Sequence, residues 1–147
     1  MNFHALIPAA GTGTRMGGMI EKQYLDLNAV PMIAHAMMVL ARAPRIARIF
    51  VVLSPTDKRW NNYAWQGWEE RIEVLRCGGR TRAETVLNGL DAIAKVCTPD
   101  DWVLVHDAAR PCLPDDMLAK LLDDVADDPV GGLLAVPVAD TLKRATA

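Results

Sequence analysis

The stretch Ile49-Phe-Val-Val-Leu53 places five apolar residues in succession, and Trp102-Val-Leu-Val105 repeats this pattern later in the chain. A strand with one exposed face alternates apolar and polar residues, whereas a strand that is covered on both faces is apolar throughout. Both stretches therefore predict strands of a parallel sheet that has helices on its two faces.

Outward from these stretches, short apolar runs alternate with amphipathic segments along the whole chain. Strands are predicted at residues 3–8, 46–53, 72–76, 102–106 and 132–138. Apolar residues recur with the spacing of one helical face in three segments between or after the strands, namely 33–41, 83–94 and 117–125. This alternation predicts an α/β fold with a doubly wound, mostly parallel sheet.

Several residues mark the expected starts of these helices. Thr81 and Glu84 form the pattern T-x-x-E of a capping box. Pro31 and Pro114 suit the first turn of a helix, because proline lacks an amide hydrogen that would be unpaired there.

The composition limits the class of protein. The chain has 147 residues, of which 51% are hydrophobic, and its formal net charge is −2. This length and apolar content predict one folded domain over residues 1–147 and exclude a disordered chain. The charge argues against a general nucleic-acid binder, which needs a basic face, but leaves a small nucleotide ligand open.

No targeting or membrane segment is expected. The N-terminus lacks a basic region ahead of a long apolar run, so it does not resemble a signal peptide. The longest uncharged helical stretch, residues 27–41, is too short and interrupted to span a bilayer. The three cysteines lie far apart without a CxxC pair, which supports neither a zinc ribbon nor a disulfide framework. A cytoplasmic protein is expected.

A glycine loop, Ala9-Ala-Gly-Thr-Gly-Thr-Arg-Met-Gly17, follows the first predicted strand. Gly11 and Gly13 allow the backbone to approach a ligand and to direct amide groups at an anion. The loop is not a Walker A motif, since Gly-Lys-Ser/Thr is absent, and Met16 replaces the third glycine of a dinucleotide fingerprint. With Arg15 and Lys22 nearby, the loop suits a polyphosphate, although a plain strand–helix turn has the same pattern.

Two further segments follow strands at the same expected edge of the sheet. Gly78-Gly-Arg-Thr-Arg82 opens a helix whose free amide groups can bind an anion or the edge of a base, or simply form a capped turn. His106-Asp-Ala-Ala-Arg-Pro111 places Asp107 where a divalent cation bound to phosphates can be held, unless this residue only caps a helix. His106 is expected to be a partly buried histidine with a satisfied ring.

Other unusual segments have simpler interpretations. The tryptophan-rich stretch 59–70 is expected to pack on the surface of the sheet domain. The aspartates at 123, 124, 127 and 128 are expected to form a solvated helix face. The methionines at 32, 37 and 38 are expected to fill the core.

Together the motifs resemble a known family. LIPAAGTGTRMG at 6–17, EKQY at 21–24, GGRTRAETV at 78–86, VLVHDAARPCL at 103–113 and PVADTLKRA at 137–145 look like 2-C-methyl-D-erythritol 4-phosphate cytidylyltransferases. The resemblance implies a nucleotide-diphospho-sugar transferase-like fold. It also implies the transfer of a cytidylyl group from CTP to a polyol phosphate with Mg²⁺, releasing pyrophosphate, in isoprenoid precursor biosynthesis.

The resemblance also implies roles for residues. Arg15 and Lys22 would stabilise the transition state, and Asp107 and Arg110 would line the polyol side near the metal, with Asp107 as a metal ligand. Thr141 would reach the same place from the fifth strand. The cytidine would be held by Ala9, Ala10, Gly11, Gly13, Gly79 and Thr85.

Three departures from the family pattern affect these expectations. Glu21 stands where the family has proline, and Arg80 stands where the family often has a smaller or acidic residue. The family also continues past residue 147 into a projecting arm used for dimerisation and into basic residues that hold the polyol phosphate. A homodimer is therefore the family's expectation, and the chain looks like the N-terminal, CTP-binding part. A ribitol 5-phosphate cytidylyltransferase and a CTP-binding module without catalysis remain alternatives.

Overall fold

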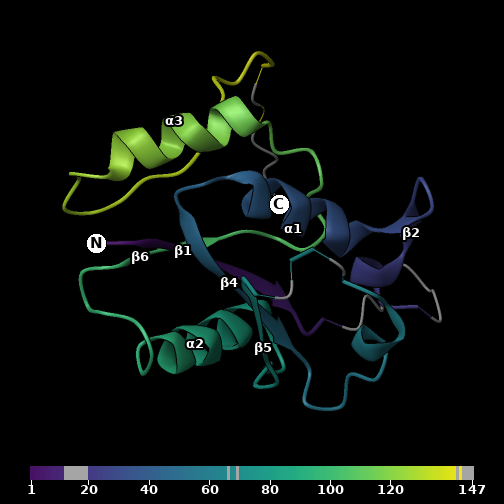
Figure 1. Ribbon diagram of the computed structural model, residues 1–147. Coiled ribbons are helices and arrows are strands. Elements are labelled where there is room, and N and C mark those ends of the chain that lie inside the picture. Colours follow the sequence, from purple (N-terminus) through teal and green to yellow (C-terminus); the bar gives the residue numbers. More distant parts are fainter. Residues whose placement is uncertain (12–19, 66, 69, 142, 144–147) are drawn as a thin grey trace.

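The computed structural model describes residues 1–11, 20–65, 67–68, 70–141 and 143. Its main sheet has four parallel strands: β1 (Phe3–Ala9), β4 (Ile46–Leu53), β5 (Ile72–Leu75) and β6 (Trp102–Val105). They lie in the order β5-β4-β1-β6 (Figure 1), so the chain winds outward in opposite directions from β1. The gap between β1 and β6 at their carboxyl ends is thus a topological switch point, where open α/β sheets bind ligands.

Helices cover both faces of this sheet, as predicted. Figure 1 shows α2 (Arg82–Ile93) on one face, and α1 (Met32–Arg42) and α3 (Asp115–Val125) on the other. The side chains of β1 alternate between the two layers. Ala5 and Ile7 join the larger core with α1 and α3, while Leu6 packs with Ile93 of α2. All three predicted helices and the first four predicted strands are confirmed to within two residues.

Three short elements connect β1 to α1 and one follows β4. They are the 3₁₀ turn η2 (Lys22–Tyr24), the antiparallel pair β2 (Asp26–Leu27) and β3 (Val30–Pro31), and the 3₁₀ turn η3 (Trp60–Asn62). Pro31 and Pro114 occupy the N-cap positions of α1 and α3, one residue before the first turn that the sequence predicted.

The tryptophan-rich segment packs on the sheet domain as predicted. Trp60 is buried, and its ring stacks on that of Trp65 with 4.3 Å between centroids. Tyr63 and Trp68 also pack against the larger core. The predicted solvated aspartates are all exposed, and Met37 is fully buried in the core.

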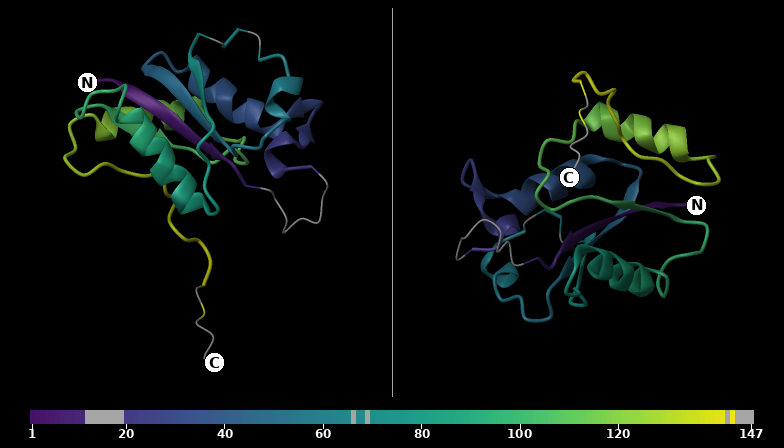
Figure 2. Two further views of the ribbon diagram at one scale, coloured as in Figure 1. Left: turned by 90° about the horizontal axis from the view of Figure 1, so that it is seen from below. Right: turned by 180° about the vertical axis from the view of Figure 1, so that it is seen from behind.

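The predicted fifth strand at 132–138 is wrong. These residues form no regular element, and Figure 2 shows the segment leaving the body of the molecule. Leu133, Val136 and Val138 are 79%, 80% and 66% exposed. Strands are stabilised by backbone pairing and by side-chain packing, and this apolar run has no pairing partner among the described residues. Its composition alone therefore does not make it a strand.

Candidate active site

A cavity of about 710 Å³ opens at the carboxyl edge of the sheet, beside the β1–β6 switch point. It brings together all three segments that the sequence singled out. Its lining comprises Pro8, Ala9, Ala10, Gly11, Lys22, Gln23, Gly79, Arg80, Thr81, Arg82, Thr85, Asp107, Ala108, Ala109 and Arg110. Most of the candidate site residues therefore line a single cavity.

The first wall is the end of β1 with η2. The amide nitrogen of the buried Gln23 side chain donates a hydrogen bond of 2.8 Å to the carbonyl oxygen of Ala9. This bond attaches η2 to the start of the glycine loop and places Lys22, the first residue of η2, on the cavity wall. Glu21 pairs with Arg59 at 2.6 Å, so an ion pair holds the position where the family has proline. Gly13 and Arg15 lie outside the described residues.

The second wall is the turn between β5 and α2. Thr81 caps α2, because its hydroxyl oxygen accepts a hydrogen bond of 3.1 Å from the backbone amide of Glu84. The carboxylate of Glu84 accepts a bond from the amide of Arg80 rather than from that of Thr81, so only half of the predicted capping box forms. Both bonds fix the turn that carries Gly79 to the cavity.

The hydroxyl of Thr85 is already committed within this wall. The side chain is buried, accepts a hydrogen bond from the amide of Gly79 at 3.1 Å and donates one to the carbonyl of Thr81 at 2.9 Å. The Thr85 hydroxyl therefore holds Gly79 in position, and the backbone of the turn is the part of this wall that is left for a ligand.

The third wall carries the single carboxylate among the described lining residues. One oxygen of Asp107 lies 2.8 Å from Nε and 2.7 Å from a terminal nitrogen of Arg82, and the other lies 2.9 Å from Nε of Arg110. Partial burial raises the pKa of the Asp107 carboxyl, but the hydrogen bonds and charges of the two arginines outweigh burial and leave the pKa below its usual value. Asp107 is thus an ionised bridge between α2 and the loop after β6.

His106 matches the expectation of a partly buried histidine. Its Nε2 lies 3.0 Å from the carbonyl oxygen of Arg110, which satisfies the ring and ties the ends of the loop together. A catalytic role is not needed to explain its position.

The lining includes residues that the sequence analysis did not name as site residues, and two of them make contacts that shape the cavity. Gln23 and Arg82 occur in segments that were quoted, but neither residue type identifies a site without the contacts to Ala9 and Asp107. Thr141, which was expected in the site, is exposed and is not among the lining residues. The strand expected to bring it there is not formed.

The cavity is electropositive although the whole chain is slightly acidic. Lys22, Arg80, Arg82 and Arg110 face one carboxylate, Asp107, among the described lining residues. Fixed cations beside exposed backbone amides stabilise an anion that gains charge during a reaction. A nucleoside polyphosphate would match both features, because its phosphates are anionic and the polar edge of its base can bond to backbone groups.

Comparisons with known proteins agree with this geometry. The family model of 2-C-methyl-D-erythritol 4-phosphate cytidylyltransferase matches residues 3–147. The chain belongs to this family. The cytidylyltransferase of Thiobacillus denitrificans is 88% identical over 99% of the chain, and that of Nitrosospira multiformis is 59% identical over 97%. The chain spans 62% of the length of each of these relatives.

Solved structures support the same fold. A crystal structure of 4-diphosphocytidyl-2C-methyl-D-erythritol synthase superposes with a TM-score of 0.85 at 39% identity, covering 99% of this chain and 64% of that one. A CMP:2-keto-3-deoxy-manno-octonic acid synthetase solved with CTP gives 0.65 at 19% identity over 88% of this chain and 49% of that one, a likeness of fold alone. Among the described residues, no helix is both long and apolar enough to cross a membrane.

Proposed function

We propose that the cavity binds CTP and serves the transfer of its cytidylyl group to 2-C-methyl-D-erythritol 4-phosphate, with release of pyrophosphate. The observation that carries the proposal is the meeting of the three family segments in one electropositive cavity at the switch point of the sheet. On this view residues 1–147 form one nucleotide-binding unit, and activity belongs to a protein of the relatives' length.

The reaction requires in-line attack of a phosphate oxygen of the polyol phosphate on the α-phosphorus of CTP. The backbone of Ala9–Gly11 on the first wall and of Gly79 on the second would hold the cytidine, since both segments line the cavity. Lys22 would stabilise the negative charge that develops on the phosphates. Arg15 and Gly13 are proposed to act in the same loop on the basis of the family resemblance.

The lining residues fit a Mg²⁺ ion that is carried by the nucleotide rather than held by the protein alone. Mg²⁺ is typically bound through one or two carboxylates together with substrate phosphates. Asp107 is the one described lining carboxylate. Two nitrogens of Arg82 contact one of its oxygens, and the other oxygen accepts a bond from Arg110 and keeps a lone pair for an ion. When bound, the ion would neutralise phosphate oxygens, while Asp107 would hold its place between Arg82 and Arg110.

Asp107 and Arg110 are proposed to face the polyol phosphate, as the family resemblance implies, because they line the same cavity as the start of the glycine loop but lie on the segment after β6. Thr141 is proposed to join them only once its segment is packed. In the 147-residue chain alone, binding of the two substrates should therefore be affected unequally. We expect the chain to keep most of its contacts to CTP but to lack groups that orient the polyol phosphate, and a misplacement of about 1 Å can reduce the rate ~10²-fold.

The test compares the 147-residue chain with a hybrid in which it replaces the matching segment of the Thiobacillus denitrificans relative. Calorimetry should show that both bind CTP with Mg²⁺ more tightly than ATP or GTP. Turnover with methylerythritol phosphate should appear in the hybrid and be very weak in the chain alone. Equal affinity for the three nucleotides would contradict the base-binding assignment. A hybrid that prefers ribitol 5-phosphate would contradict the proposed substrate.

The homodimer remains a prediction of the family resemblance. Sedimentation of the chain and the hybrid would measure it, and a monomeric hybrid would contradict it.

A further inference from the structure

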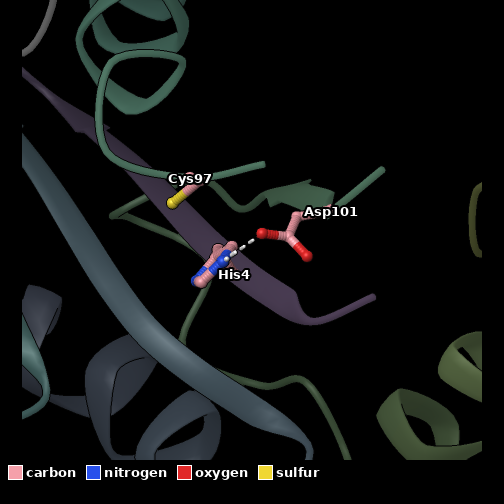
Figure 3. A group of neighbouring side chains, drawn as sticks. All are labelled: His4, Cys97 and Asp101. Carbon is pink, nitrogen blue, oxygen red and sulfur yellow. Dashed lines mark hydrogen bonds and ion pairs between the residues drawn. The ribbon is translucent and has the colours of Figure 1, made fainter. Parts of the chain in front are cut away.

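A second group of reactive side chains lies at the opposite end of the sheet from the cavity. Figure 3 shows His4, Cys97 and Asp101 turned toward one another, from the start of β1 and from the connection between α2 and β6. A ring nitrogen, the thiol sulfur and a carboxylate oxygen lie within 4.8 Å of one another, the one such group among the described residues. At about 3.3 Å per residue, His4 lies ~17 Å along β1 from Ala9, so this group is separate from the nucleotide site.

Two of these groups form a long hydrogen bond whose length also matches the spacing of two ligands on a shared ion. Nε2 of His4 and an oxygen of Asp101 are 3.4 Å apart, which is long for a nitrogen–oxygen hydrogen bond. Two ligands that each lie about 2.0–2.1 Å from a tetrahedral Zn²⁺ are separated by ~3.4 Å. The pair therefore has the separation of two ligands before any ion is bound.

The Asp101 carboxylate is held in place by the backbone. One oxygen accepts a bond of 2.6 Å from the amide of Asn2, and the other accepts one of 3.0 Å from the amide of Thr98. These bonds keep the carboxyl ionised, with a pKa below its usual range. They also leave lone pairs for a further partner, as metal-binding carboxylates commonly have.

His4 has an unmet polar group in the protein interior. The residue is 4% exposed, and its Nδ1 has no hydrogen-bond partner. The ring packs edge-on against Phe50, with 5.9 Å between centroids. An ion bound at Nε2 would leave Nδ1 as it is, so Nδ1 does not itself support the site. The burial of the ring is what fixes the direction of Nε2.

Cys97 supplies the soft ligand. Burial raises the pKa of its thiol, although the neighbouring Arg48 guanidinium lowers it in part. Arg48 is itself paired with the carboxylate of Glu73, so the two charges beside the thiol offset each other. A thiolate and the Asp101 carboxylate together carry the two negative charges that balance a divalent cation.

We propose that His4, Cys97 and Asp101 bind one Zn²⁺ ion, with water in the fourth position. Sulfur, imidazole and carboxylate ligands in a tetrahedral arrangement suit Zn²⁺. Coordination replaces the thiol hydrogen of Cys97 by the ion, so one proton is released to solvent. The ion would join the first residues of β1 to the loop before β6 and thereby stabilise the strand that holds the glycine loop.

The test uses the whole chain, kept reduced by a phosphine without thiols. Zn²⁺ affinity is measured by competition with a chromophoric chelator, and Co²⁺ is added separately to report a thiolate ligand through its near-ultraviolet charge-transfer band. Cys97→Ser, His4→Gln and Asp101→Asn should each weaken Zn²⁺ binding at least about tenfold. Cys77→Ser and Cys112→Ser are the matched controls and should bind like the original chain.

The Co²⁺ band of the unaltered chain keeps the test decisive if a variant fails to fold. A band with one ion per chain that disappears in Cys97→Ser supports the site. Absence of the band, its loss in Cys112→Ser instead, or Zn²⁺ binding that Cys97→Ser leaves unchanged would overturn the proposal. Asp107→Asn distinguishes the nucleotide site, since it should leave the band intact.

Discussion

Substitution by alanine should have different effects at two glycines near the cavity, lowering stability at one and ligand affinity at the other. Gly78 follows β5, and its amide donates a bond of 2.9 Å to the carbonyl of Leu53. A Cβ on Gly78 would lie 2.2 Å from Cβ of Ala10 and 2.7 Å from that carbonyl oxygen. A Cβ on Gly11 would meet no atom within 4 Å. Gly78→Ala should therefore disturb the fold, whereas Gly11→Ala should disturb only the approach of a ligand.

The expected magnitudes follow from these contacts. The Cβ of Ala10 and the carbonyl oxygen of Leu53 cannot turn aside as the end of a flexible side chain can. The turn must therefore shift by about 1 Å, and overpacking of this kind costs about 1–3 kcal/mol. For a chain of this size, this corresponds to a melting temperature lower by about 2–12 °C. Gly11→Ala should leave the free energy of unfolding within ~0.5 kcal/mol. Its affinity for CTP should fall at least tenfold, or about 1.4 kcal/mol.

Thermal unfolding of the two variants measures the expected change in stability, and calorimetric titration with CTP measures the expected change in affinity. A Gly78→Ala chain that melts within about 1 °C of the original would refute the packing argument. If Gly11→Ala binds CTP normally, the nucleotide does not approach this backbone, and the base must lie elsewhere in the cavity.

Three further predictions concern single side chains. Lys22→Ala in the hybrid should lower turnover by on the order of 10²-fold, and a change in KM alone would contradict a role in the chemical step. Arg82→Gln should raise the pKa of Asp107, as measured by NMR titration, and an unchanged pKa would show that Arg110 suffices. Burial and the hydrogen bond to Asp57 raise the pKa of Tyr24 above its unfolded value. The contribution of Tyr24 to the free energy of unfolding is therefore fully present below pH ~10. Above that pH it falls by about 1.4 kcal/mol per pH unit, because the unfolded chain loses the phenol proton first. In Tyr24→Phe, urea unfolding should lack that extra fall, and identical pH profiles would contradict it.

Local patterns were sufficient to predict most of the fold. The continuous apolar runs of β4 and β6 identify two strands, and the spacing of apolar residues identifies the three helices. These features depend on residues close in the sequence. Burial on both faces is confirmed for most of β4 but not for β6, which lies at the edge of the sheet and is only half-buried. The hairpin of β2 and β3 was missed because its turn uses Asn28 and Ala29, both at positive φ, and alanine is not the glycine that usually marks such a turn.

Features that depend on distant partners could not be predicted in the same way. Residues 132–138 have the composition of a strand, but a strand also needs a neighbour to pair with, and composition does not report one. Arg82 and Asp107 are 25 positions apart, so their ion pair becomes visible only when α2 and the loop after β6 meet. The cluster of His4, Cys97 and Asp101 could not be predicted for the same reason, because its members meet only when β1 packs beside β6.

The net charge of the chain and the charge of its cavity lead to different conclusions about ligands. A charge of −2 over 147 residues argues against an extended polyanion, which needs a broad basic face. Four cations and one carboxylate at the described cavity wall concentrate positive charge where the sheet's strands end. Because charges more than about 10 Å apart are largely screened at ordinary ionic strength, the acidic exterior does not cancel this local field. The local charge therefore favours a compact polyphosphate, as proposed, while the net charge argues against nucleic acid.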